Sequence, residues 1–61
     1  MARSKFRIEW DSKLNEYRSV FPEPFTEWNR THETITMAYD YMRKDAKVTS
    51  YIQVIGRDAA A

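Results

Sequence analysis

Two prolines, Pro22 and Pro24, interrupt the chain within VFPEPFTEWN, residues 20–29. Each proline ring fixes φ and removes a backbone donor, and the residue before each proline is pushed toward an extended conformation. A helix or the ladder of a central strand cannot run through such a stretch. We therefore expect a stiff, polyproline-like crossover here, with regular elements before and after it.

The segment after the crossover, HETITMAYDYMRKD (residues 32–45), has helical periodicity. Its apolar residues recur at i, i+3, i+4, i+7 and i+11, which places them on one face of a helix: Ile35, Ala38, Tyr39, Met42 and Ala46. Thr31 is the expected N-cap, and Arg43 and Lys44 suit the last turn. The pattern predicts a helix over residues 32–45 that buries this face.

The last regular segment is KVTSYIQVIGR, residues 47–57, which is rich in β-branched residues and meets the only glycine, Gly56. Alternation predicts a strand with two faces: Val48, Ser50, Ile52 and Val54 on one, and Thr49, Tyr51, Gln53 and Ile55 on the other. The second face is mixed rather than charged. This composition suits an inner strand, or an edge strand that pairs with something else.

The N-terminal third begins with a strand in which Phe6, Ile8 and Trp10 alternate with polar residues. Residues 12–21 allow two interpretations. Apolar residues at helical spacing would fit a helix, whereas a turn at 11–15 followed by EYRSVF would fit a second strand. The hairpin is preferred, because without it the sheet would have only two strands and would be marginal.

These elements predict an α+β fold: a small three-stranded antiparallel sheet with one helix on a face, in the order β-β-α-β. We expect one domain over residues 1–58 and a disordered tail or cloning scar over 59–61. A chain of 61 residues without cysteine buries only about 60% of its unfolded surface and has no disulfide to stabilise it. Its nine aromatic residues, 15% of the chain, are expected to supply much of the core.

The charges are balanced and interspersed, with 10 basic and 9 acidic residues and a net charge of +1. A nucleic-acid-binding protein usually carries a basic stripe, whereas here Arg3, Lys5 and Arg7 are followed at once by Glu9 and Asp11. Binding to nucleic acid is therefore disfavoured. No apolar run approaches the roughly 20 residues of a membrane span, and no signal peptide is recognisable, so we expect a cytoplasmic protein without membrane contact.

Residues for catalysis or metal binding are scarce. The single histidine, His32, begins HETIT, but Thr36 stands where the zinc motif H-E-x-x-H needs its second histidine. No serine lies in a recognisable pattern with the base and the orienting group that a catalytic nucleophile needs. A phosphate-binding loop needs several glycines, and the chain has one. We expect neither enzymatic activity, nor a metal, nor a cofactor.

The crossover is the strongest candidate for a binding site. Phe25 and Trp28 could fold back over the open end of the core, which is the simpler outcome, or stay partly exposed and contact a partner. Met37 and Tyr41 lie on the flank of the helix between its apolar and charged faces. The predicted partner-binding residues are Phe21, Glu23, Phe25, Glu27, Trp28, Met37, Tyr41 and Tyr51.

In its order of elements, residues 5–56 resemble small host-takeover proteins of bacteriophages, such as inhibitors of bacterial RNA polymerase and anti-CRISPR proteins. No motif is shared, so the resemblance implies no functional residue. It implies a stoichiometric binder that blocks a larger protein of the host, in the host cytoplasm. Two alternatives remain: a nucleic-acid-binding module that uses Arg3, Lys5, Arg7, Lys13 and Arg18, or an assembly subunit whose Tyr51–Ile55 strand pairs across a two-fold axis as a homodimer.

Overall fold

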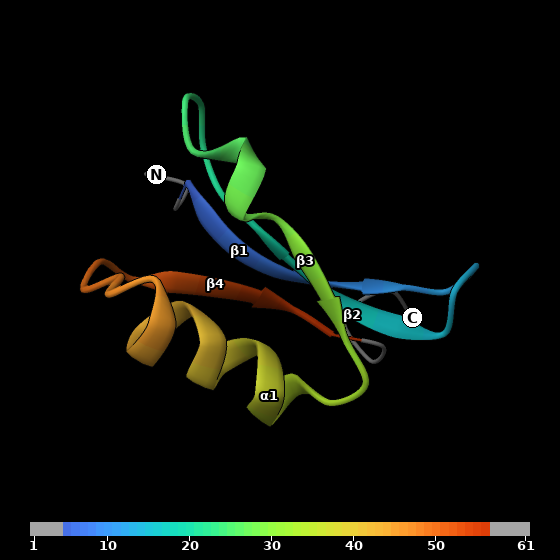
Figure 1. Ribbon diagram of the computed structural model, residues 1–61. Coiled ribbons are helices and arrows are strands. Elements are labelled where there is room, and N and C mark those ends of the chain that lie inside the picture. Colours follow the sequence, from blue (N-terminus) through green and yellow to red (C-terminus); the bar gives the residue numbers. More distant parts are fainter. Residues whose placement is uncertain (1–4, 57–61) are drawn as a thin grey trace.

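The computed structural model describes residues 5–56, and the predictions for Arg3, Arg57 and the 59–61 tail lie outside this range. The fold is α+β: one helix lies against one face of a four-stranded mixed sheet (Figure 1). The strand order is β3-β2-β1-β4. The elements are β1 (Phe6–Asp11), β2 (Glu16–Val20), the 3₁₀ turn η1 (Thr26–Trp28), β3 (Arg30–His32), α1 (Ile35–Asp40), the π-helical turn η2 (Tyr41–Asp45) and β4 (Ile52–Ile55).

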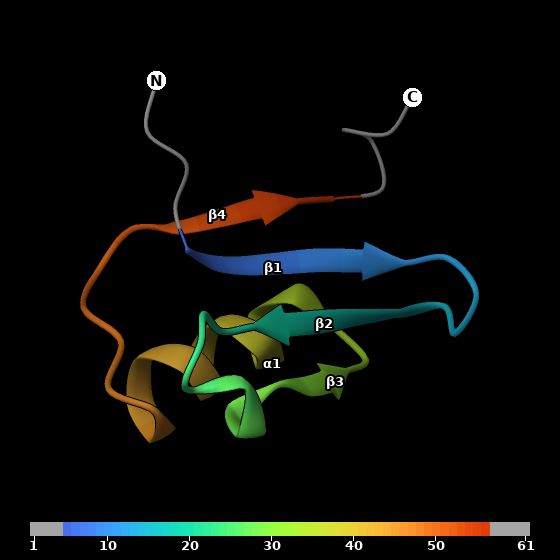
Figure 2. The ribbon, with the colours of Figure 1, turned by 90° about the horizontal axis from the view of Figure 1, so that it is seen from above.

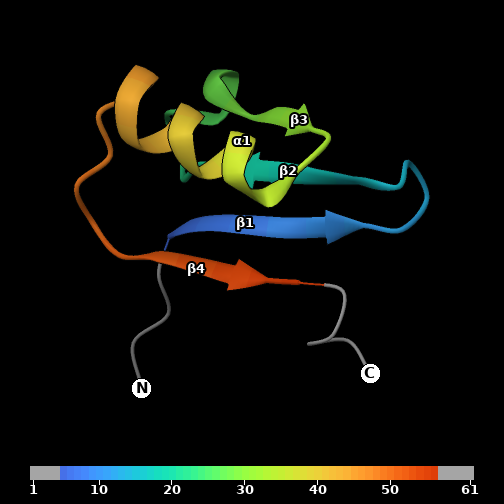
Figure 3. The same cartoon turned by 90° about the horizontal axis from the view of Figure 1, so that it is seen from below.

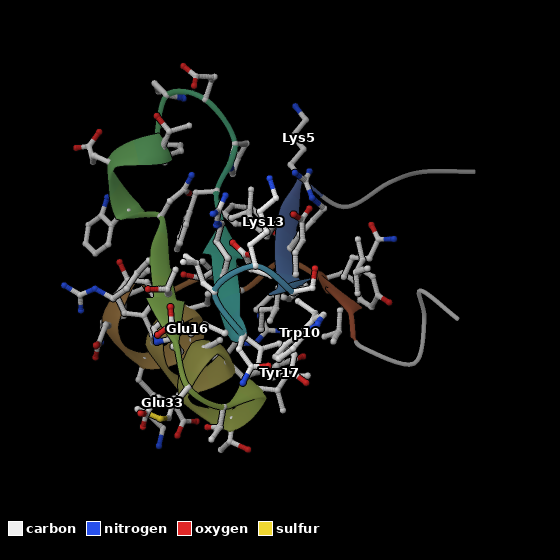
Figure 4. All side chains as sticks on the ribbon, turned by 90° about the vertical axis from the view of Figure 1, so that its right-hand side faces the viewer. Lys5, Trp10, Lys13, Glu16, Tyr17 and Glu33 are labelled. Carbon is white, nitrogen blue, oxygen red and sulfur yellow. The ribbon has the colours of Figure 1, made fainter. Side chains whose placement is uncertain are left out.

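The preferred hairpin over the first two strands is confirmed. β1 and β2 are antiparallel, with Trp10 opposite Tyr17. The Asp11 carboxylate closes the turn by accepting the backbone N–H groups of Lys13 and Leu14, at 3.0 and 3.2 Å. Asn15 has φ +57°, a left-handed conformation that asparagine tolerates better than most residues. Figure 4 looks at this hairpin from its turn and shows Trp10 and Tyr17 next to each other, in an edge-to-face contact with ring centroids 5.0 Å apart.

The predicted three-stranded antiparallel sheet is wrong in two linked respects. Residues Arg30–His32, which lie after the predicted crossover and include the predicted cap Thr31 and the predicted first helical residue His32, form β3 and pair with β2. This extra strand reverses the chain once more before the helix. After the helix, the chain therefore runs in the same direction as β1, and β4 pairs with β1 in parallel. Phe6 lies opposite Ile52, and Ile8 lies opposite Val54.

The helix begins later than predicted. Thr31 is paired with Arg18 in the sheet, so the cap is Thr34, whose side chain accepts the Met37 N–H at 3.2 Å. At the other end the helix widens into the π-helical turn η2, in which the Ala46 N–H donates to the Tyr41 carbonyl. The predicted C-terminal boundary, Asp45, is confirmed.

The last strand is shorter than predicted, because the chain from Lys47 to Tyr51 is not in the sheet. Lys47 has φ +60° and turns the backbone away from the helix. The Arg43 guanidinium then donates to the carbonyls of Val48 and Ser50, at 2.9 and 2.8 Å. These bonds hold the segment beside the helix, and the strand starts only at Ile52.

The buried core lies between the helix and one face of the sheet. Among residues 5–56, six apolar residues are buried: Ile8, Phe21, Ala38, Met42, Val48 and Ile52. Ile35 and Tyr39 are partly buried against them, so the predicted face of the helix is the one that packs. Figures 2 and 3 show that the helix lies over β2 and β3 rather than over β4, and Val54 is accordingly 39% exposed.

Candidate functional site

The proline-rich stretch is a tight turn rather than the predicted polyproline-like crossover. The Glu23–Pro24 peptide bond is cis, and the Phe25 N–H donates to the Pro22 carbonyl at 2.7 Å. This is the arrangement of a turn with a cis proline at its third position. The chain then continues directly into η1, where the Trp28 N–H donates to the Phe25 carbonyl.

Two side-chain hydrogen bonds attach this loop to the rest of the fold. The Asn29 side chain accepts the Phe21 N–H at 2.7 Å, which joins the two ends of the loop. The Tyr41 hydroxyl donates to the Trp28 carbonyl at 2.6 Å, which joins the loop to the helix. Sequence reasoning missed Asn29, although asparagine beside a turn is a frequent partner for backbone groups.

Four of the predicted residues form one connected surface at this end of the molecule, which we call the aromatic surface: Phe25, Trp28, Met37 and Tyr41. Phe25, Trp28 and Met37 are 51%, 40% and 49% exposed. The Trp28 and Tyr41 rings are in contact, with centroids 6.5 Å apart. Tyr41 also lines a groove together with Met37, so it links η1 to the helix.

Phe21 supports this surface from beneath. It is only 4% exposed, and its ring contacts those of Trp28 and Tyr41 at centroid distances of 6.4 and 6.1 Å. Both predicted outcomes therefore hold for Trp28: one side of the ring packs on the core, and the other side is exposed to solvent. Phe25 is the more exposed of the two.

A groove of about 330 Å³ runs beside the aromatic surface. It is lined by the rings of Phe6, Phe21, Phe25 and Trp28 and by the segment from Ala46 to Ser50. Because four aromatic rings line it, the groove can accept an apolar group. Lys47, also in its lining, adds a cationic side chain to an otherwise largely apolar site.

A second, more polar groove of about 320 Å³ lies on the helix side of Tyr41. Arg30 sits over the Tyr41 ring, with its guanidinium carbon 5.1 Å from the centroid. His32 is also in the lining, and its Nε2 is 3.3 Å from the Oγ of the buried Ser19. Burial lowers the pKa of His32, and the nearby Arg30 guanidinium lowers it further.

The remaining predicted residues lie around this surface rather than in it. Glu23 and Glu27 are exposed in the loop and in η1. Tyr51 is 73% exposed just before β4 and directly follows Ser50, the last residue of the groove lining. None of these three side chains contributes to the groove walls.

The opposite face of the sheet carries paired charges. Arg7 forms an ion pair with Glu9, and Arg18 with Asp11 at 3.0 Å. The register also places Glu9 opposite Arg18, whereas Asp11 lies opposite Glu16. Two of the basic residues considered for nucleic-acid binding are thus paired with carboxylates, while Lys5 and Lys13 are exposed.

Within residues 5–56, no group of three or more His, Asp or Glu side chains is arranged to hold a metal ion. The helices in this part of the chain are too short and too polar to cross a membrane. Comparisons of the chain with protein-family models, curated proteins and solved structures find no match. The aromatic surface and its groove are therefore the features that bear on function.

Proposed function

We propose that this chain is a non-enzymatic protein-binding module that modulates a larger protein by stoichiometric binding, with the aromatic surface as its contact. The observation that carries the proposal is the clustering of exposed apolar side chains: Phe25, Trp28 and Met37 are each at least 40% exposed. Phe25 and Trp28 line one groove, Met37 and Tyr41 line the other, and the Trp28 and Tyr41 rings are in contact. Aromatic residues and methionine are enriched in the cores of protein interfaces. Trp and Tyr are also frequent among the residues that dominate binding energy.

The rigidity of the surface supports this function. The loop that presents Phe25 and Trp28 is closed by the bond between Phe25 and Pro22 and attached to the helix by Tyr41. A loop that is already ordered loses little conformational entropy when it binds. The groove beside it offers a recess for an apolar side chain of the partner.

The charge distribution favours this function over nucleic-acid binding. Affinity for nucleic acid comes mainly from unpaired basic groups that replace counterions on phosphates. On the outer face of the sheet, Arg7 and Arg18 are engaged by carboxylates instead. The exposed apolar side chains of the aromatic surface therefore fit a protein partner better than the paired basic groups fit nucleic acid.

The test is affinity purification from a lysate of the native host with the wild type, Phe25→Ala and Leu14→Ala side by side. Leu14 is the matched control, because it is 56% exposed but lies in the hairpin turn. We expect one protein at near-stoichiometric amounts with the wild type and Leu14→Ala, and at least about tenfold less with Phe25→Ala, as for a residue at the centre of an interface. Equal recovery with both variants, or recovery of nucleic acid alone, would contradict the proposal.

A further inference from the structure

The outer edge of β4 lacks the charges and prolines that often protect a sheet edge. Among residues 5–56, β4 pairs only with β1, and no strand lies on its other side (Figure 2). Edge strands usually carry charges, prolines or bulges, or are very short, because their free backbone groups can pair with another chain. The sequence Tyr51–Ile55 contains neither a charge nor a proline.

The other edge of the sheet is protected. β3 has only three residues, two of which, Arg30 and His32, carry ionisable side chains. Both face the ring of Tyr41, at 5.1 Å for Arg30 and 5.2 Å for His32. The two edges thus differ in charge and cover, and of the two, β4 is better suited to pairing with a further strand.

Apolar side chains accompany this edge on both faces of the sheet. On the face that bears the helix, Val54 is 39% exposed although its register partner Ile8 is fully buried, because the helix lies over β2 and β3 (Figure 3). On the outer face, Ile55 belongs to β4, and Tyr51 directly precedes the strand; continued alternation would place it on the same side as Ile55. Tyr51 is 73% exposed.

The geometry of a symmetric pair selects a register. Two copies of an edge strand that pair antiparallel are related by a two-fold axis perpendicular to the sheet, so opposite residues must belong to the same face. An axis at Gln53 sets Ile52 opposite Val54 of the second copy. Where the pairing extends one residue before β4, it also sets Tyr51 opposite Ile55 of the second copy. Each pair occurs twice, and all four pairs are apolar or aromatic with β-branched, which are favourable cross-strand combinations.

The neighbouring register is less complementary. An axis at Val54 sets Val54 opposite itself, but it places Gln53 opposite Ile55 and Ile52 opposite Gly56. Two apolar side chains then lose an apolar partner. We infer that the occupant of this edge is a second copy of the chain, paired antiparallel through β4 with Gln53 at the axis.

The dimer joins two four-stranded sheets into one continuous sheet. The paired segment is short, so its buried area falls below the roughly 1,600 Å² of a standard stable interface. Association is therefore concentration-dependent. The aromatic surface is a different set of residues, and failure of the dimer would leave the proposed partner binding standing.

The first test is sedimentation velocity of the purified chain from about 10 µM to about 1 mM, the range of weak association. We expect monomer at the low end and dimer at the high end. Val54→Lys should weaken association at least about tenfold, since each dimer loses two apolar pairs. Thr31→Lys, which places the same charge on the β3 edge, should leave it unchanged. A monomer at every concentration, or equal weakening by both variants, would overturn the inference.

The second test keeps the inference falsifiable if Val54→Lys does not fold. The chain has no cysteine, so a single introduced cysteine can form a disulfide only with the same residue of a second copy. The rate of oxidation then shows how close the two residues lie. Opposed residues of an antiparallel pair have Cβ atoms about 4.5–5.5 Å apart, near the range that a disulfide spans. Gln53→Cys should therefore oxidise to a covalent dimer faster than Val54→Cys and much faster than Thr31→Cys. Fastest oxidation of Thr31→Cys, or equal rates in all three, would contradict the register.

Discussion

The outer face of the sheet and the aromatic surface are both exposed, but their side chains are arranged in opposite ways. On the outer face, Arg7 and Arg18 find carboxylate partners within the same hairpin. On the aromatic surface, Phe25 and Met37 are about half exposed, and a groove runs beside the loop. The hairpin charges of the outer face are engaged in ion pairs, whereas the aromatic surface leaves apolar side chains exposed to solvent.

The largest expected effect concerns the core beneath these two surfaces. Met42→Ala should lower the free energy of unfolding by about 2–5 kcal/mol, because Met42 is fully buried between helix and sheet. Met37→Ala is the matched control: it is the same residue type on the same helical stretch but 49% exposed, so its effect should be well below 1 kcal/mol. Urea denaturation measures both. Equal loss in the two variants would show that the buried face is assigned wrongly.

Removal of the Trp28 ring should have the next largest effect. Trp28 contacts Phe21 and Tyr41 but is 40% exposed, so Trp28→Ala should cost less than a fully buried ring, about 1–3 kcal/mol. Trp28→Phe, which keeps an aromatic ring on Phe21, should recover part of this. Thermal unfolding followed by circular dichroism compares the two. A Trp28→Ala variant that melts like the parent would mean that the loop is held by its hydrogen bonds alone.

Stability should also fall on mild acidification because of His32. Its pKa is lowered in the fold, so the unfolded chain binds more protons than the folded chain between the lowered value and about 6.5. The contribution of the neutral imidazole is complete above about pH 6.5 and decreases as the pH falls below it. Denaturation at several pH values above 5 should show this slope in the wild type and not in His32→Gln. The same slope in both would assign the effect to other groups.

The smallest effect is expected on the outer face. Arg18→Gln removes an ion pair whose arginine side chain is 48% exposed, and exposed pairs contribute about 0–1 kcal/mol. Recovery of the partner should not change. A larger loss of stability, or a loss of binding, would mean that this face does more than carry paired charges.

The elements whose apolar residues recur with a clear period could be predicted from the sequence. The i, i+3, i+4, i+7 spacing of Ile35, Ala38, Tyr39 and Met42 identified the buried face of the helix, since that spacing survives any shift of the helix ends. Alternation in β1 and the turn at Asp11 were enough to favour the hairpin.

The rest depended on tertiary contacts that leave a weak local signal. Three residues, Arg30–His32, are too few to show alternation, so β3 was missed, and with it the parallel pairing of β4. Thr31 was predicted as the cap, but it pairs with Arg18 in β3, and Thr34 caps the helix instead. For the site, composition identified the aromatic residues of the loop, but the bonds of Asn29 and Tyr41 that hold the loop in place could not be read from spacing.

The central claim is that the aromatic surface, and not the outer face, contacts a protein partner. Its most direct test is photo-crosslinking with benzoylphenylalanine, placed at position 25 in one variant and at position 18 in the other. Both positions are exposed, so neither substitution should disturb the core. Irradiation in a lysate of the native host should give one discrete crosslinked protein from position 25 and none from position 18. The same band from position 18 alone, or from both positions equally, would contradict the claim.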